Sequence, residues 1–159
     1  EPISTLPENA KAKLLDVFSG WASVISETIE KTPDENLLGG TIYDRQPNKG
    51  WYKGCATLLG DAAHATTPNL GQGACMAIED AVVFAKCVKD YGYKDSLQAY
   101  QKLRFSRTSK IVKKSRLMGR IFQIENPTME MARNFCVRIM PSFMMAADLE
   151  SSFKWKRHF

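Results

Sequence analysis

The sequence predicts a mostly helical α/β fold, and two observations support this prediction. Apolar residues recur at three- and four-residue steps through much of the chain, which is the spacing of helices with one buried face. One uninterrupted apolar run, Cys55 to Leu59, ends at a glycine and is typical of a buried strand instead. With 159 residues, the chain is long enough to bury a hydrophobic core.

The first part of the chain predicts two short helices and a strand. Thr5 and Glu8 have the spacing of a capping box, so a helix is expected to begin there and to break at Gly20. A second helix should end before Pro33, because the residue preceding a proline disfavours the helical conformation. Residues 37–44 are short, β-tolerant and flanked by turn formers, and they predict a strand.

The middle of the chain predicts a strand followed by a helix. The run from Cys55 to Leu59 is expected to be a fully buried strand. From Gly73 to Val88 the pattern is helical, and its small side chains would permit close approach to a sheet. The residues expected on that buried face are Ala74, Ala77, Ile78, Ala81, Val82, Ala85 and Val88.

The last third predicts further helices. Asp95 or Ser96 can cap a long helix that runs to about Arg120, and Asn126 opens another that must end by Pro141. The long helix is strongly basic through Lys102, Arg104, Arg107, Lys110, Lys113, Lys114, Arg116 and Arg120. A solvated helix face explains these charges better than nucleic-acid binding, because no aromatic side chains alternate with them.

Composition narrows the class of protein. No apolar run approaches the roughly 18 residues of a membrane span, so a membrane protein is not expected. The Met-rich end and the basic-aromatic tail, residues 140–157, are expected to be a docked core helix with a frayed end rather than a membrane anchor. The cysteines show no C-x-x-C pairing. At least three of them lie in apolar segments and should pack as small hydrophobic residues. The four are Cys55, Cys75, Cys87 and Cys136.

The segment from Leu58 to Asp80 has the composition of a ligand site. Its pattern predicts a strand, a sharp turn at Gly60-Asp61, a loop, and a helix start that is flanked by glycines. A carboxylate after a strand can accept hydrogen bonds from two hydroxyl groups, and a helix N-terminus offers unpaired N–H groups and partial positive charge. The simpler alternative is a strand-loop-helix crossover in which Asp61 only caps the loop.

The same segment closely resembles the second flavin-binding motif of the p-hydroxybenzoate hydroxylase-like monooxygenases. The resemblance rests on Gly60-Asp61-Ala62-Ala63-His64, then Pro68, Gly71-Gln72-Gly73 and Glu79-Asp80. It extends from Leu14 to about Gly119 and is strongest toward the salicylate hydroxylase, urate hydroxylase and zeaxanthin epoxidase-like branch.

This resemblance implies a flavin site and a reaction. Asp61 would bind the ribityl side of FAD, and Pro68 would lie beside the isoalloxazine ring. The helix start would reach the pyrimidine end of the ring through Leu70, Gly71, Gln72, Gly73 and Ala74. The family implies NAD(P)H as reductant, O2 as oxidant, and a small aromatic or alkene substrate that is hydroxylated or epoxidised. A cytoplasmic location is expected from the cysteines, whose pattern favours reduced thiols. The catalytic residues remain unknown from this sequence.

The resemblance also implies a domain organisation. Residues 1–50 would end the substrate-domain region, residues 51–120 would form the C-terminal part of a Rossmann-like FAD-binding domain, and residues 121–159 would form a helical segment and tail. The family's G-x-G-x-x-G pyrophosphate turn after a first strand does not occur in this sequence. We therefore expect an N-terminal FAD-binding half as partner, in the same or a separate chain, and an inactive isolated chain.

Two further interpretations concern function. A non-catalytic helical interaction module derived from such an enzyme is the alternative to the monooxygenase. His64 is expected to be a structural residue hydrogen-bonded near the loop, since one carboxylate and one imidazole are too few for a closed metal site. No metal is therefore expected.

Overall fold

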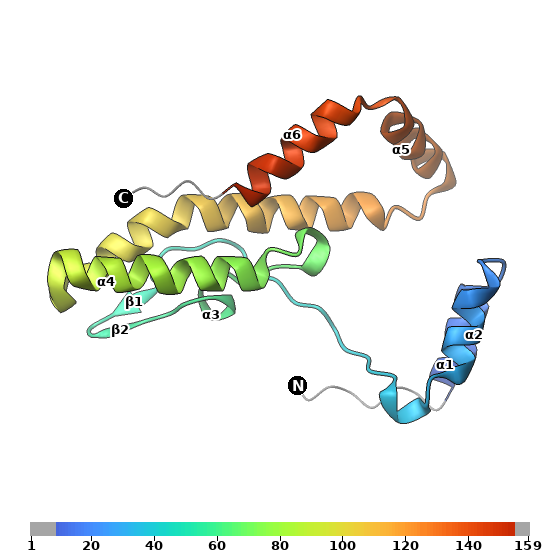
Figure 1. The fold of residues 1–159 in the computed structure, drawn as a ribbon, viewed down its shortest axis with the longest axis horizontal. Helices are drawn as coiled ribbons and strands as arrows, with labels where there is room; N and C mark the ends of the chain where they lie inside the picture. The colour runs from blue at the N-terminus through green and yellow to red at the C-terminus, as the bar shows by residue number, and fades with distance from the viewer. Residues whose placement is uncertain (1–8, 155–159) are drawn as a thin grey trace. The chain divides into compact units, whose positions relative to one another are not determined.

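The computed structural model describes residues 9–154. One compact unit ends at Ile42 and a second begins at Tyr43. Within the described residues, helices predominate, and the sheet consists of β1 (Tyr52–Lys53) and β2 (Ala56–Thr57). This confirms the mostly helical prediction (Figure 1). None of the described helices combines the length and the apolar character that a membrane crossing requires.

The first unit contains the two short helices that the sequence predicts. They are α1 (Ala10–Val17) and α2 (Ser23–Lys31), followed by the 3-10 turn η1 (Asp34–Asn36). The predicted break lies at Gly20, whose φ of +82° is a left-handed conformation that favours glycine. The capping box at residues 5–8 lies outside the described residues. Neither helix has a buried residue, so the expectation of one buried face is wrong here.

The strand predicted at residues 37–44 is wrong, because these residues have no regular structure. A strand persists only when its backbone N–H and C=O groups pair with a neighbouring strand. Among the described residues, the ladder pairs only Tyr52 with Thr57 and Lys53 with Ala56, so the 37–44 segment has no strand to pair with.

The predicted strand at 55–59 is shorter and more exposed than expected. Only Ala56 and Thr57 pair, as the second strand of a tight hairpin, and Cys55 and Leu58 are exposed. The expectation of full burial is therefore wrong. Burial of both faces of a strand needs layers of chain above and below it, and the described residues do not provide them.

Helix α4 (Gly73–Phe122) contains both the helix predicted at Gly73–Val88 and the long helix predicted to run to about Arg120. Gly92 has φ +67° and ψ 176°, which are not helical, and the chain reverses there so that the two halves of α4 lie side by side (Figure 1). Ahead of α4 come the short α3 (Asp61–His64) and the 3-10 turn η2 (Pro68–Leu70). Both contact α4.

The first half of α4 buries a different face from the predicted one. Ile78 is 67% exposed and Val82 is 45% exposed, whereas the buried residues are Met76, Glu79, Asp80, Val83 and Cys87. The physical reason is that the second half of α4 supplies the packing surface, and its Arg104 pairs with both buried carboxylates.

The core lies where the hairpin meets the bend of α4. Trp51, Val83 and Tyr100 form its centre, with Trp51 and Tyr100 ring centroids 5.7 Å apart. The chain entering β1 is fixed by Gln101, whose Oε1 accepts hydrogen bonds from the N–H groups of Gly50 at 2.9 Å and Trp51 at 2.8 Å. The hairpin is thereby tied to the second half of α4.

The C-terminal region forms α5 (Pro127–Ile139) and α6 (Ser142–Phe153). The predicted start of α5 is confirmed, because the Asn126 side chain accepts hydrogen bonds from the N–H groups of Thr128 and Met129. The docked-core expectation for the Met-rich end is wrong, since Phe143 is 70% exposed and Met144 is 51% exposed. The tail beyond residue 154 lies outside the described residues.

The cysteines are free thiols, and only Cys87 is buried. Burial raises the pKa of the Cys87 thiol, and the nearby Asp90 carboxylate adds to this effect. Cys55, Cys75 and Cys136 are exposed, so the expectation that most of the cysteines pack as small hydrophobic residues is wrong.

Candidate functional site

The candidate site begins at a turn that only glycine accommodates well. Gly60 has φ +56° and ψ −137°, and a Cβ added there would lie 3.2 Å from the Cβ of Ala77 on α4. Its N–H donates a hydrogen bond to Oδ2 of Asp80 at 3.0 Å. The turn therefore lies directly against α4, and the next residue, Asp61, begins α3 with an exposed side chain.

The loop after α3 is fastened to the second half of α4. The hydroxyl groups of Thr67 and Ser115 are 2.8 Å apart, and the Ser115 hydroxyl also donates to the Thr67 carbonyl at 2.7 Å. Asn69 Nδ2 donates to the Ser115 carbonyl at 3.1 Å. A Cβ on Gly119 would lie 2.6 Å from that Asn69 nitrogen, so glycine is needed for the close approach. These contacts hold Pro68 and Leu70 in place.

The start of α4 is an uncapped helix N-terminus. Gly71 has a left-handed φ of +62°, Gln72 precedes the helix, and no side chain caps the first turn of α4, which also lacks acidic residues. The first N–H groups and the positive end of the helix dipole are therefore available to an anion or a polar ligand. A Cβ added at Gly73 would lie 3.9 Å from Oδ1 of Asp61, so the carboxylate lies beside the helix start.

The structure brings the predicted flavin-binding residues together around this helix start. Asp61, Pro68, Gly71 and Ala74 are exposed, Leu70 and Gly73 are partly exposed, and Gln72 is buried. The Nε2 atom of Gln72 is buried without a hydrogen-bond partner. The exposed carboxylate is an acceptor and the first backbone N–H groups of α4 are donors, and together they form a set that fits the polar part of a flavin. The unpartnered Gln72 amide lies buried beside them.

A buried ionic network lies beneath this surface, and the sequence did not reveal it. Asp80 is completely buried, with Oδ2 at 2.6 Å from His64 Nε2 and Oδ1 accepting from Arg104 Nε at 2.6 Å. Glu79 accepts from Arg104 Nη1 at 2.7 Å and binds Arg107 through two hydrogen bonds of 2.7 Å. Both buried carboxylates therefore have cationic partners from the same chain.

The network determines the protonation of its carboxylates. Burial by itself would raise the pKa of Asp80, but hydrogen bonds from His64, Arg104 and the Gly60 N–H together hold this pKa below its ordinary value. Burial likewise opposes the ionisation of Glu79, and the hydrogen bonds from Arg107 and Arg104 hold its pKa below the ordinary value. Both groups therefore remain anionic at neutral pH.

Two sequence predictions concern this network. The structural interpretation of His64 is confirmed, because its ring is buried and contacts Asp80. The solvated-face interpretation is wrong for Arg104, which is 2% exposed and neutralised by buried acids. One signal was available: Asp80 and Arg104 are equally distant in sequence from Gly92, as residues paired across a helical hairpin would be.

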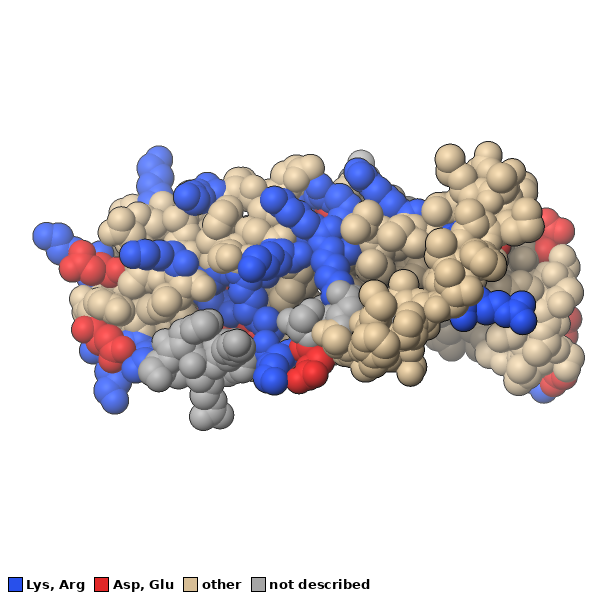
Figure 2. Space-filling view, turned by 90° about the horizontal axis from the view of Figure 1, so that it is seen from above, with Lys and Arg blue, Asp and Glu red and all other residues tan. Residues whose placement is uncertain are grey.

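Other basic residues of α4 are also paired with acids of the same chain. Arg107 is paired with Glu79, and Arg116 is paired with Asp44. Figure 2 shows one face of the molecule, on which some Lys and Arg side chains project singly and others adjoin one another. Part of the positive charge of α4 is therefore neutralised within the described residues.

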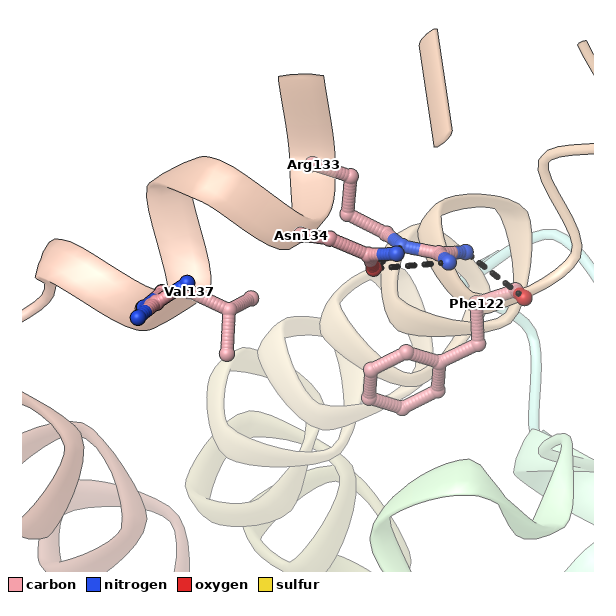
Figure 3. A pocket seen from close by; sticks show the side chains of 5 residues that line it. Phe122, Arg133, Asn134 and Val137 are labelled. Atoms are coloured by element: carbon pink, nitrogen blue, oxygen red, sulfur yellow. Dashed lines mark hydrogen bonds between the residues drawn. The ribbon is translucent and has the colours of Figure 1, made fainter. Parts of the chain in front are cut away.

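A surface depression at the far end of α4 lies away from these residues. The guanidinium group of Arg133 lies in this depression. It donates hydrogen bonds at 3.2 Å to the carbonyls of Ile121 and Phe122 and at 2.9 Å to the side chain of Asn134 (Figure 3). The depression is lined by Phe122, Arg133, Asn134, Val137 and Arg138. Arg133 therefore satisfies the C-terminal carbonyls of α4, and the depression shows no converging catalytic groups.

Comparisons with known proteins place the chain among FAD-binding domains and oxygen-transferring enzymes. Residues 42–115 match the family described as an FAD binding domain. The chain is 42% identical over 135 residues to the aurachin C monooxygenase/isomerase of Stigmatella aurantiaca, covering 84% of this chain and 35% of that protein. It is 44% identical over 119 residues to the chloroplastic zeaxanthin epoxidase of Oryza sativa subsp. japonica, covering 67% of this chain and 18% of that protein.

Solved structures give the same result. The fold is similar to that of Klebsiella pneumoniae HpxO complexed with FAD and uric acid, with a TM-score of 0.81 and 27% identity, over 91% of this chain and 38% of that one. A variant of HpxO complexed with FAD matches with a TM-score of 0.82 and 26% identity, over 96% of this chain and 41% of that one. The chain thus spans less than half the length of each of these proteins.

Proposed function

Because the chain belongs to the p-hydroxybenzoate hydroxylase-like family of FAD-dependent monooxygenases, we propose that residues 60–74 form the ribityl and isoalloxazine side of an FAD site. The observation that carries the proposal is the exposed Asp61 carboxylate beside the uncapped N-terminus of α4. This pairing offers an acceptor for hydroxyl groups and donors for an anion within one surface.

Each residue of the site has a distinct role in this proposal. Asp61 accepts hydrogen bonds from the ribityl hydroxyl groups, and Pro68 and Leu70 lie against the ring system. The N–H groups from Gln72 to Ala74 face the pyrimidine end of the ring, where negative charge develops on reduction, and the helix dipole stabilises that charge. Gly71, whose own N–H donates to the Pro68 carbonyl at 2.9 Å, supplies the left-handed turn before them. FAD, reduced by NAD(P)H, supplies the activation of O2, while the protein orients the ring and excludes water.

The proposed enzyme needs a second half to complete the cofactor site. The pyrophosphate turn and the sheet of a Rossmann-like domain would come from an N-terminal FAD-binding half, and residues 51–120 would complete that domain. The exposed face of α4 supports this proposal, because Ile78 and Val82 are apolar and their neighbours on that face are alanines. Small side chains on a helix allow close packing against a sheet. The chain alone is then inactive.

The substrate class follows from the relatives and stays part of the proposal. One related structure contains uric acid, and two relatives are named for aurachin C and zeaxanthin. These names support oxygen transfer to a small aromatic or alkene substrate.

A second candidate function has one specific observation in its favour. Helix α5 exposes Met131, Phe135 and Ile139, which are 69%, 62% and 61% exposed. Their spacing of four residues places them on one face, as in a helical module that binds another protein. A measurement of flavin binding distinguishes the monooxygenase from the interaction module, because an interaction module does not require flavin.

The purified protein, expressed together with its FAD-binding half, tests the proposal. We expect flavin absorbance that is released on denaturation, and Asp61→Ala should lower FAD affinity by about 10- to 100-fold, as expected for loss of hydrogen bonds to a charged acceptor. Asp90→Ala is the matched control, because Asp90 is an exposed carboxylate outside residues 60–74 that pairs with Lys86 four residues away. Equal FAD affinity in both variants would remove Asp61 from the site.

A further inference from the structure

We infer that Asp80 is a positioning residue of the flavin site, because its buried carboxylate holds the Gly60 turn from which Asp61 is presented. The consequence for flavin rests on the proposed function. The positioning contact itself does not, since it lies entirely within this chain.

Asp80 acts through other residues rather than on a ligand. Its side chain is completely buried, with a relative exposure of 0%. Oδ2 accepts the Gly60 N–H at 3.0 Å and lies 2.6 Å from His64 Nε2, while Oδ1 accepts from Arg104 Nε at 2.6 Å. Contacts to both oxygens fix the rotation of the carboxylate, so it cannot turn away from Gly60 without breaking the contact with Arg104.

The two residues bound by Oδ2 lie at the two ends of α3. Gly60 directly precedes this helix and His64 is its last residue, so Asp80 holds both ends of the short segment that begins with Asp61. The Gly60 carbonyl also accepts hydrogen bonds from the N–H groups of Ala63 at 3.0 Å and His64 at 2.9 Å. Helix α3 is too short to keep its geometry alone. The contacts of Asp80 with Gly60 and His64, which we call the Asp80 clamp, therefore determine where the Asp61 carboxylate lies.

The Asp80 clamp also fixes the distance between the Asp61 carboxylate and the start of α4. Asp61 Oδ1 lies 3.9 Å from the position of a Cβ on Gly73, so a shift of α3 moves the carboxylate relative to the start of α4. A ligand that binds both groups is sensitive to this spacing, because misplacement by about 1 Å strongly weakens oriented contacts.

Glu79 provides a matched comparison. It is buried like Asp80, with 7% exposure, and belongs to the same ionic network. Its carboxylate binds Arg104 and Arg107, which are both on the second half of α4 rather than on the Gly60 turn. A change at Glu79 perturbs the network but leaves the contact between Asp80 and Gly60 in place.

Hydrogen exchange at the Gly60 amide tests the positioning contact without flavin. In Asp80→Asn the single amide oxygen should remain with the Arg104 cation, because charge-assisted hydrogen bonds are the stronger ones, and the Gly60 N–H then loses its acceptor. We expect Gly60 exchange to accelerate by about tenfold or more, whereas Glu79→Gln should change it less than about twofold. Equal acceleration in both variants, or none in Asp80→Asn, would overturn the inference.

If Asp80→Asn does not fold, the unmodified protein decides. The Gly60 amide should then exchange as slowly as the amides of Ala63 and His64, which are hydrogen-bonded within the same turn. Fast exchange of Gly60 alone would contradict the Asp80 clamp.

A double-mutant cycle tests the link to flavin. Asp80→Asn should weaken FAD binding about tenfold in the otherwise unmodified protein and by less than about twofold in the Asp61→Ala background, because the two residues act through one contact. Urea unfolding of each variant would separate this effect from lost stability. Additive losses would overturn positioning through Asp61. If the unmodified protein binds no FAD, the proposed function fails, and Gly60 exchange still decides whether Asp80 holds the turn.

Discussion

The two faces of the first half of α4 differ in whether this chain supplies their partners. The buried face combines apolar side chains such as Val83 with the ionised residues Glu79 and Asp80, whereas the exposed face has Ile78 and Val82. The buried charges are fully partnered by this chain, and the exposed apolar face has no partner among the described residues. One side of α4 therefore has all its charged partners within this chain and positions the candidate site, and we propose that the other side packs against a sheet.

Breaking the buried side should have the largest effect. Arg104→Met removes the guanidinium group shared by Glu79 and Asp80 and leaves two carboxylates buried with fewer partners. We expect a loss of about 3–5 kcal/mol in the free energy of unfolding, measured by urea denaturation. A variant as stable as the unmodified protein would show that the network does not hold the two halves of α4 together.

Overfilling the contact between the loop and α4 should have an intermediate effect. In Gly119→Ala the new methyl group meets the Asn69 side chain, which would then lose its hydrogen bond to Ser115. We expect a loss of about 1–3 kcal/mol in stability, as for other overpacked sites. The double variant Gly119→Ala with Asn69→Ala should recover part of this loss, because the obstructing amide is gone. No recovery would mean that the methyl group clashes elsewhere.

Acid should gradually lower the free energy of unfolding that the buried carboxylates of α4 contribute. Folding lowers the pKa of Glu79 and Asp80 from ordinary values of 4.5 and 3.8, so the unfolded chain takes up protons first as the pH falls. The stability from these groups is complete above about pH 5 and is lost as the pH decreases through 4.5 and below. Urea unfolding at a series of pH values measures this slope. Glu79→Gln should reduce it by at most about 1.4 kcal/mol per pH unit, and an unchanged slope would contradict the pairing.

Changing the exposed face should have the smallest effect on stability. Val82→Ser replaces a side chain that is 45% exposed, so the free energy of unfolding should change by less than about 0.5 kcal/mol. The same change should weaken assembly with an N-terminal FAD-binding half, measured by co-purification. Normal assembly of Val82→Ser and Ile78→Ser would show that the sheet does not pack on this face.

The sequence predicted local features well and long-range burial poorly. The Gly60-Asp61 turn, the helix start at Gly73 and the Asn126 cap are decided by neighbouring residues, and the structure contains each of them. The buried face of α4 was predicted wrongly because two sets of residues both repeat at helical spacing. One set contains Met76, Val83 and Cys87, and the other contains the alanines. Choosing between the two faces required knowing that Arg104 returns to Asp80, which periodicity does not report.

The strand errors have the same cause. Residues 37–44 and 55–59 have strand-like composition, but pairing and burial depend on neighbours that the described residues do not supply. The motif thus predicted the Gly60-Asp61 turn and the helix start that lie side by side in the structure, whereas the buried network beneath them could not be predicted from it.

Hydrogen exchange with and without flavin tests the central claim most directly. In the protein assembled with its FAD-binding half, exchange is compared before and after FAD is added, in peptides covering residues 60–75 and 127–139. We predict slower exchange in residues 60–75, with the strongest change at the amides of residues 72–75, and no change at 127–139. Unchanged exchange in residues 60–75, although FAD is bound, would contradict the assignment of this surface to the cofactor.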